Sequence, residues 1–266
     1  MNIFIKELKS YRNGLLFWSL GMFMLVASGM AKFAAYSVSG SQSITDLMAQ
    51  FPKSIQVIFG LEGFDLTKAS GFYGVLFLYI ALMATVHAVL IGTDIISKEE
   101  RDKTSEFLFV KPISRAKIIT GKLLAGLINI IILNIVTWVS SIYFVNYFGK
   151  GESVGNNIQI LMTGLIMLQL LFFVIGFAVA SISKKPKTAP SVATAILLIT
   201  FIISFLVNLN PNLDKLKYLT PYKYFDAHIL IADGHLDFVY VIITLSLITL
   251  SLILSYFYYP KRDLDI

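Results

Sequence analysis

The chain has 266 residues, of which 56% are hydrophobic and only 14% are charged. Soluble domains usually carry about 25% charged residues, so this composition excludes an ordinary water-soluble fold and indicates a membrane protein. The chain contains no Cys, which excludes a disulfide framework and any Cys-based metal or redox site.

Residues 1–13 are predicted to form a short amphipathic helix that lies on the membrane surface, because their apolar and basic side chains fall on different helical faces. The alternative is a simple extension of the first membrane span. The apolar face consists of Phe4, Leu8, Tyr11 and Leu15.

Six segments are long and apolar enough to span about 30 Å of hydrocarbon, which takes about 20 residues. The first follows a basic stretch but is too long for the apolar region of a signal peptide, so we expect it to be retained. The sequence therefore predicts a single all-α, polytopic transmembrane domain over residues 1–266. The spans lie near Leu15–Val38, Phe72–Ile96, Ile118–Phe148, Ile158–Ile182, Ala189–Leu209 and Leu236–Tyr259.

Residues 97–117 interrupt the apolar pattern between the second and third spans, and ten of these 21 residues are charged. A stretch this polar cannot lie in hydrocarbon. The second helix can continue to Lys103, Pro112 ends helical geometry before itself, and Ser114 is a candidate N-cap for the third span. The apolar residues 107–110 between them would form an exposed patch that seeks a partner, or would pack on lipid headgroups or on their own bundle.

Residues 208–235 precede the last span and contain Pro211 and Pro221, so we expect an outer re-entrant segment whose irregular backbone is covered by protein. His228 and His235 lie in this segment beside acidic residues. Their spacing matches no metal motif, and no metal site is predicted.

The distribution of basic residues predicts the orientation. Fifteen of the 22 Lys and Arg lie in the N-terminal arm, residues 98–122, the 184–187 turn and the tail. The positive-inside rule then places both termini in the cytosol, as an even number of spans requires. The net charge of +6 is thus explained by topology, and no basic–aromatic module indicates nucleic-acid binding. We expect a multi-pass protein of a bacterial plasma membrane.

Ionisable groups inside a span are candidates for function. His87 and Asp94 are seven residues apart on one face of the second span, which makes them candidates for a substrate path. Asp94 is close to the cytosolic edge, where it could instead cap the entry or pair with a nearby Lys. Lys32 is expected to reach the outer surface. Hydrogen bonds between helices are expected for Asn129, Asn134 and Gln169.

No catalytic motif is present in the chain. There is no G-x-x-x-x-G-K-[ST] sequence and therefore no nucleotide-binding P-loop. Glu99 and Glu100 lie outside the predicted membrane core, and position 104 is Thr rather than the Arg that an intramembrane protease of the paired-glutamate type requires. We therefore expect neither an enzyme nor a cofactor in this chain.

Residues Glu99–Leu124, which begin E-E-R-D-K-T-S-E-F-L, resemble the signature of ABC-2-type permeases, the membrane subunits of a class of ATP-binding-cassette exporters. Lys103 and residues 109–111 depart from the common pattern. Tyr218–Gly234 resembles the family's outer segment before the last span. The signature is matched by Thr104, Glu106, Phe107, Leu108, Pro112, Ile113, Ser114, Arg115, Gly121, Lys122 and Leu123.

The resemblance implies a complex of two permease protomers, identical or related, with two cytosolic ATPase subunits that bind ATP and Mg. Residues 97–117 would form the coupling helix that docks on the ATPase, with Phe107 and Leu108 as apolar anchors. Charge complementarity would come from Glu99, Glu100, Arg101, Glu106 and Arg115.

The alternatives are a six-span membrane enzyme, a secondary carrier, or a scaffold subunit that transports nothing. No internal repeat supports a carrier with inverted repeats. The residues do not specify the substrate.

Overall fold

The structure is a computed structural model that describes residues 3–38, 50–61, 63–102, 114–149, 152, 154–183, 185 and 187–261, and all regular structure in these ranges is helical. The long helices are α1 (Ile3–Val38), α4 (Ala69–Arg101), α6 (Arg115–Phe148), α7 (Gly155–Ile182), α8 (Ala189–Leu209) and α11 (Phe238–Tyr258). The short ones are α3 (Lys53–Ile58), α9 (Pro221–Tyr224), α10 (Ala227–Asp233) and the 3-10 helices η1 (Pro211–Leu219) and η2 (Tyr259–Lys261).

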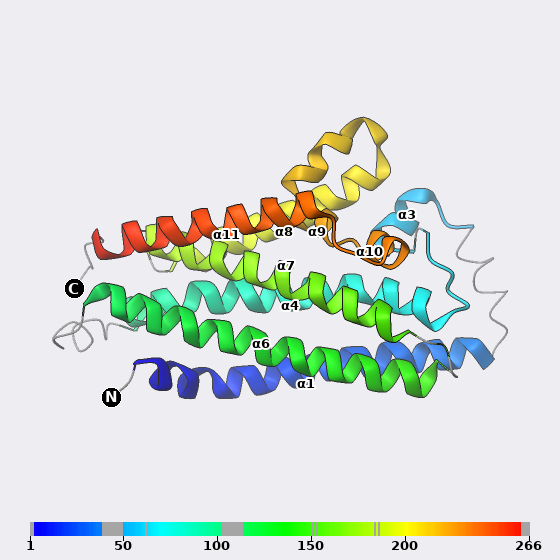
Figure 1. The fold of residues 1–266 in the computed structure, drawn as a ribbon, viewed down its shortest axis with the longest axis horizontal. Coiled ribbons are helices and arrows are strands. Elements are labelled where there is room, and N and C mark those ends of the chain that lie inside the picture. Colours follow the sequence, from blue (N-terminus) through cyan, green and yellow to red (C-terminus); the bar gives the residue numbers. More distant parts are fainter. Residues whose placement is uncertain are drawn as a thin grey trace.

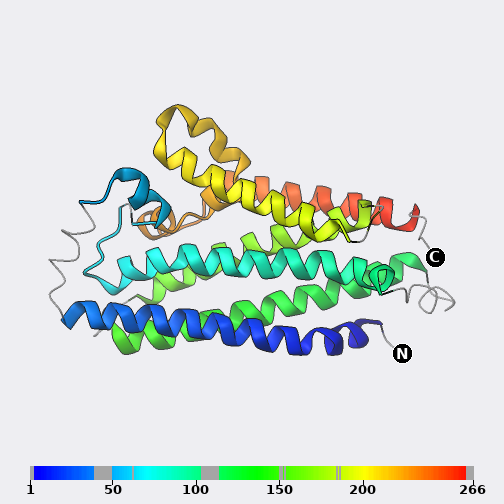
Figure 2. The same ribbon diagram turned by 180° about the vertical axis from the view of Figure 1, so that it is seen from behind.

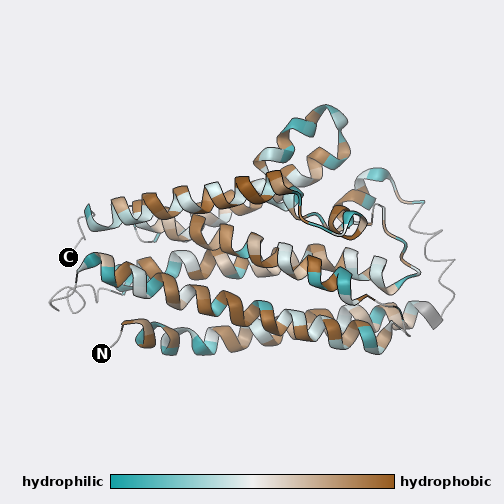
Figure 3. Cartoon of the chain, in the orientation of Figure 1, coloured by the Kyte–Doolittle hydropathy of each residue, from teal (hydrophilic) through white to brown (hydrophobic). Residues whose placement is uncertain are grey.

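Among the described residues, the six long helices are each long and apolar enough to cross a membrane, which confirms the predicted six-helix, all-α architecture. They run side by side in one elongated bundle (Figures 1 and 2). Apolar residues dominate the middle of the long helices, and hydrophilic residues gather at the ends and in the short elements (Figure 3). Helix α1 begins and α11 ends at the same end of the bundle, which we call the terminal end; the opposite end is the distal end.

Helix α1 runs without a break from Ile3 to Val38, so residues 3–13 are not a separate helix. No Pro interrupts residues 3–38, so the helix is not broken where the first span was predicted to begin. The structure instead matches the alternative prediction, in which these residues extend the first membrane helix. The apolar face of this extension packs against the bundle core, and the position of residues 3–13 relative to the membrane stays a prediction.

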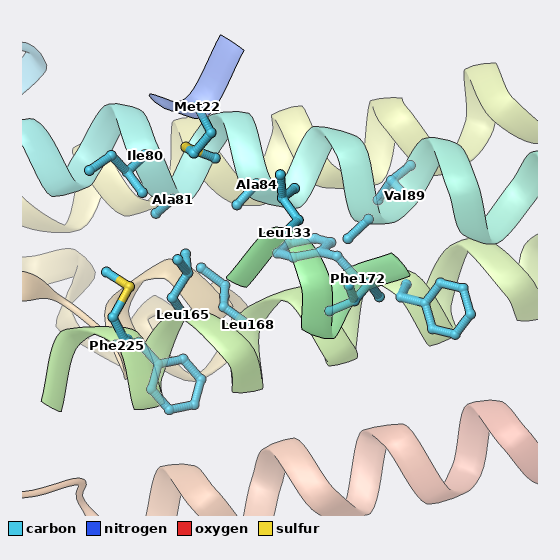
Figure 4. Packing of buried hydrophobic residues seen from close by; sticks show 14 of the residues in the cluster. Met22, Ile80, Ala81, Ala84, Val89, Leu133, Leu165, Leu168, Phe172 and Phe225 are labelled. Atoms are coloured by element: carbon cyan, nitrogen blue, oxygen red, sulfur yellow. The ribbon is translucent and has the colours of Figure 1, made fainter. Parts of the chain in front are cut away.

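Helices α4 and α7 form the centre of the bundle and are largely buried, whereas only a small part of α8 and α11 is buried. Two glycines allow the backbones of α4 and α7 to approach closely. A Cβ atom at Gly92 would collide with the carbonyl oxygen of Phe173, and one at Gly176 would lie 2.8 Å from that of Val89. Farther along, buried residues of α7 face α4 (Figure 4), among them Leu165, Leu168 and Phe172 opposite Ile80, Ala81 and Ala84.

Two of the three residues predicted to bond between helices do so, and they share one hydrogen bond. Asn134 Nδ2 donates to Gln169 Oε1 at 3.1 Å and so links α6 to α7. Asn129 instead donates to the carbonyl of Ala125, one turn earlier in its own helix. Lys32 is exposed, as expected for a side chain that reaches toward water.

In the 208–235 segment, η1 and α9 contact each other and α8, while α10 packs on α4 and α7, so these residues do not form a span. The hydroxyl groups of Tyr222 and Thr85 form a hydrogen bond of 2.7 Å. Thr220 Oγ1 donates to the Thr200 carbonyl at 2.7 Å. Asp226 caps α10 by accepting from the His228 backbone N–H at 3.0 Å. The depth of this group in the membrane stays a prediction.

Candidate functional site

The structure places the two ends of the predicted coupling segment at the terminal end. Helix α4 continues past the span to Arg101, as predicted, so that Glu99 and Glu100 lie on its last turn. Ser114 is the N-cap of α6, and its hydroxyl accepts from the Lys117 backbone N–H at 3.4 Å. The remaining predicted coupling residues lie outside the described ranges; these are Thr104, Glu106, Phe107, Leu108 and Pro112.

Arg115, the first residue of α6, contacts the C-terminal part of the chain. Its Nη1 donates to the Pro260 carbonyl at 2.8 Å. The start of α6 is thereby tied to the η2 turn that follows α11. The C-terminal side of the predicted coupling segment is therefore attached to the end of the chain.

Four buried or nearly buried charged residues of α1, α4 and α6 form one group, the Lys122 cluster: Glu7, Lys98, Glu99 and Lys122. The fully buried ammonium of Lys122 donates to both carboxylate oxygens of Glu99, at 2.7 and 2.8 Å. It also lies 3.4 Å from Glu7 Oε1 and donates to the Ile95 carbonyl. Glu7 in turn pairs with Lys98.

The Lys122 cluster contains two carboxylates and two ammonium groups, so its formal charges cancel. Burying charges is costly, and the cost is offset only where every partner is present and well placed. Removing one partner from such a group costs about 3–5 kcal/mol, because a buried charge is left without compensation. The cluster therefore fixes the end of α4 relative to α1 and α6, directly before residue 103.

Sequence reasoning missed the roles of Glu7 and Lys122 in this cluster. Lys122 was noted only as one of the basic residues of the inner boundary and as part of the signature. The burial of Glu7 could have been predicted from the sequence, because Glu7 lies next to Leu8 and four residues before Tyr11, two residues of the apolar face of α1. Glu99 was expected to complement a partner's charge, but its carboxylate is turned into the bundle.

A second polar group lies on the same side of α4 one to two turns from the cluster. Tyr11 donates its phenol proton to Asp94 Oδ2 at 2.7 Å, and Arg101 pairs with the other oxygen of Asp94. The Lys98 ammonium lies 4.5 Å from the centre of the Tyr11 ring, a cation–π contact. Asp94 therefore forms an ion pair with Arg101 of its own helix, whereas the sequence suggested a nearby Lys as its partner.

A cavity of about 300 Å³ adjoins Asp94 between α1, α4, α6 and α8. His87 and Asp94, predicted to share one helical face, both line this cavity. His87 is buried, and its ring centre lies 5.3 Å from that of Trp18. The full lining consists of Tyr11, Gly14, Leu15, Trp18, His87, Leu90, Ile91, Thr93, Asp94, Arg101, Asn129 and Pro190.

A larger cavity of about 440 Å³ lies at the distal end, where the 208–235 segment covers α4 and α8. Its polar wall is an ion pair, with Lys223 Nζ at 2.6 Å from Asp226 Oδ2 and 2.8 Å from Asn208 Oδ1. The ring of His228, on the same wall, packs edge-on against Phe64 with ring centres 5.6 Å apart. Within the described ranges, no group of three or more metal-ligating side chains is present.

Six apolar helices of spanning length define the chain as a polytopic α-helical membrane protein. Residues 1–264 match the model of the ABC-2 family transporter protein, and because this match covers nearly the whole sequence, the chain belongs to that family. A comparison with curated protein sequences finds no similar protein. The family makes the chain a membrane permease of an ABC transporter, a kind of protein that works with ATP-binding subunits.

Proposed function

We propose that the chain is the permease subunit of an ABC exporter, and that it moves its substrate outward with ATP hydrolysed by a separate subunit docked on residues 97–117. The permease itself carries out no catalysis, and the partner binds ATP and Mg. Two permease protomers and two ATPase subunits form the complex in a bacterial plasma membrane, with both termini in the cytosol. Family membership and the positive-inside charge distribution support this proposal.

The Lys122 cluster is the observation that carries the docking role. The cluster joins the two ends of the proposed docking segment, since Glu99 lies near the start of the segment and Lys122 lies just after its end. Glu7 adds α1 to the same group. A displacement of the segment by the ATPase would thus reach three helices at once, through contacts that resist stretching because their charges are buried.

The docking residues divide into two kinds. Phe107 and Leu108 would supply the apolar anchor, and Glu100, Arg101, Glu106 and Arg115 would set register and charge complementarity. Glu99 would act from inside the bundle, by holding Lys122. Coupling requires that the docked segment interacts differently with the two states of the ATPase. Thr104, Pro112 and Ser114 would shape the turn that presents the anchor.

The candidate substrate path runs past His87 and Asp94. Both residues line one cavity at the terminal end, which supports their assignment to a common path. The cavity is bounded by helices that the Lys122 cluster connects. A movement of the docking segment would therefore change the shape of this cavity.

The docking role is tested with the partner ABC ATPase, which we expect a neighbouring gene to encode, by co-purification and by ATP hydrolysis in the complex. Replacing Phe107→Ala together with Leu108→Ala should lower ATPase capture about tenfold or more, since two buried apolar anchors are worth at least ~1.4 kcal/mol. A matched control is Leu250→Ala with Phe257→Ala, the same two residue types exposed on α11. Unchanged capture and coupling in the first variant would remove the docking assignment.

A further inference from the structure

We infer that the exposed basic face of α1, which consists of Lys6, Lys9 and Arg12, binds the headgroups of anionic lipids in the leaflet at the terminal end. The partner is therefore the lipid surface beside the bundle. No ATP-binding subunit takes part in this contact, so the inference does not depend on the proposed docking role.

The first observation is a group of exposed cations without a counter-ion. Lys6, Lys9 and Arg12 are exposed, and none of them forms an ion pair with another described residue. Glu7, in the same turns, is buried and pairs with Lys98. The first turn of α1 holds no acidic residue, although the dipole of a helix favours anions at its N-terminal end. The charge of this face is thus left for a partner to neutralise.

The second observation is that the same face of α1 continues into an apolar strip. Helix α1 lies at the edge of the bundle (Figures 1 and 2). Leu16 lies four residues after Arg12 and seven after Lys9, so the three side chains share one face. Exposed surface of this kind on a membrane helix contacts lipid tails, which are as apolar as Leu. The strip consists of Leu16, Phe17, Leu20, Phe23 and Met24, which are 40% to 77% exposed.

The third observation is the length of the uncharged stretch. No charged residue lies between Arg12 and Lys32, and both are exposed. The twenty residues from one to the other rise about 30 Å along an unbroken helix, which equals the thickness of the hydrocarbon layer. If Lys32 reaches one headgroup layer, Arg12 therefore reaches the other.

The remaining two cations lie farther out on the terminal side. Lys9 is about 4.5 Å and Lys6 about 9 Å beyond Arg12 along the helix axis. The headgroup layer adds about 5–7 Å on each side of the hydrocarbon, so Lys9 lies within it. Lys6 lies just beyond it, closer to the phosphates than one Debye length of about 8 Å. All three cations are thus within electrostatic reach of anionic headgroups.

A lipid surface fits these observations better than a second protein. A protein bound to the basic face alone would have to enter the headgroup layer to reach Arg12, beside a strip that faces lipid tails. An anionic headgroup meets the cations at their own depth, and each basic residue near such a surface strengthens binding about fivefold. The contact would also hold Glu7 in place, on the buried side of the same turns, and with it the Lys122 cluster.

A reporter on the apolar strip measures the contact directly. Phe17 is 77% exposed and lies five residues from Arg12. Phe17→Trp, combined with Trp18→Phe and Trp138→Phe, leaves a single tryptophan beside the lipid in question. The purified full chain is reconstituted in phosphatidylcholine vesicles, and a growing share of the lipid is replaced by phosphatidylglycerol with brominated chains, which quench tryptophan on contact. A parallel series uses brominated phosphatidylcholine.

The anionic lipid should be preferred at the reporter at least about fivefold. Replacing Lys6→Gln, Lys9→Gln and Arg12→Gln together in the reporter protein should lower the preference below about twofold. About 1 M salt should do the same with the basic face unaltered, because the Debye length then falls to about 3 Å. The salt series needs no folded Gln variant, and a preference that persists unchanged in it would refute the contact.

The matched control removes the same charge from exposed residues of the terminal end outside α1, with Lys185→Gln, Lys187→Gln and Lys261→Gln. It should keep the preference, since quenching reports only the lipid next to α1. Equal quenching by the two lipids, or an equal loss of preference in the control, would overturn the inference. Quenching by neither lipid would overturn it as well, because a protein surface such as a second protomer would then cover this face. No ATPase is present in the vesicles, so failure of the proposed docking role would leave this result unchanged, and the reverse also holds.

Discussion

The terminal and distal ends of the bundle are held together by different chemistry. At the terminal end, buried ion pairs of the Lys122 cluster connect α1, α4 and α6. At the distal end, the Lys223–Asp226 pair joins neighbouring residues of one segment, and the contacts between elements include the Tyr222–Thr85 bond and the stacked rings of Tyr224 and Tyr240, whose centres lie 4.8 Å apart.

This difference predicts different responses to mutation. In a buried charged group, each member depends on the others, so the loss of one leaves the rest uncompensated. In a set of aromatic and hydroxyl contacts, each contributes roughly 0.5–1.5 kcal/mol, and the loss of one leaves the others intact. The terminal end should therefore be sensitive to single substitutions, and the distal end tolerant.

The largest effect is expected from Lys122→Met, which removes the ammonium and leaves two buried carboxylates facing each other. Unfolding in detergent, followed by circular dichroism, should show a loss of about 3–5 kcal/mol. Lys117→Met on the same helix is the control, because Lys117 is exposed and should tolerate the change. Adding Glu99→Gln to Lys122→Met should recover part of the loss. A Lys122→Met protein as stable as the control would mean that the cluster does not hold this end.

An intermediate effect is expected from Gly92→Ala. The new methyl group would meet the backbone carbonyl of Phe173, which cannot rotate away, so α4 and α7 would have to separate. Overpacking of this kind costs about 1–3 kcal/mol. Gly155→Ala is the matched control, since nothing lies within 4 Å of its added methyl group, and it should stay within about 0.5 kcal/mol. Similar unfolding midpoints for both variants would show that the backbones need not approach so closely.

The smallest effect is expected from Tyr222→Phe at the distal end. It deletes the bond to Thr85 but leaves Thr85 bonded to the Ala81 carbonyl at 2.8 Å, so no buried group is orphaned. The loss should be about 0.5–1.5 kcal/mol. Tyr218→Phe, at a half-exposed position of η1, serves as the reference and should change less. If Tyr222→Phe cost as much as Lys122→Met, the contrast between the two ends would be invalid.

Local patterns predicted much of the fold. Apolar runs placed all six long helices to within a few residues at most boundaries, and the Ser114 cap followed from its place after Pro112. The first long helix begins at Ile3 and not near Leu15, because amphipathicity alone does not decide whether such a stretch is a separate helix or an extension that packs on its own bundle. His87 and Asp94 were placed on one face by helical spacing, and both line the same cavity.

The amino-acid sequence by itself determined the membrane class, the six spans and the charged segment between the second and third, because these depend on hydropathy and helical period, which are local properties. Tertiary structure decided which charges meet. Glu7 and Lys122 are far apart in the chain and become partners only when α1 packs along α6 beside the end of α4. The same packing buried His87 next to a cavity, since the burial of a side chain depends on neighbouring helices that its own segment does not specify.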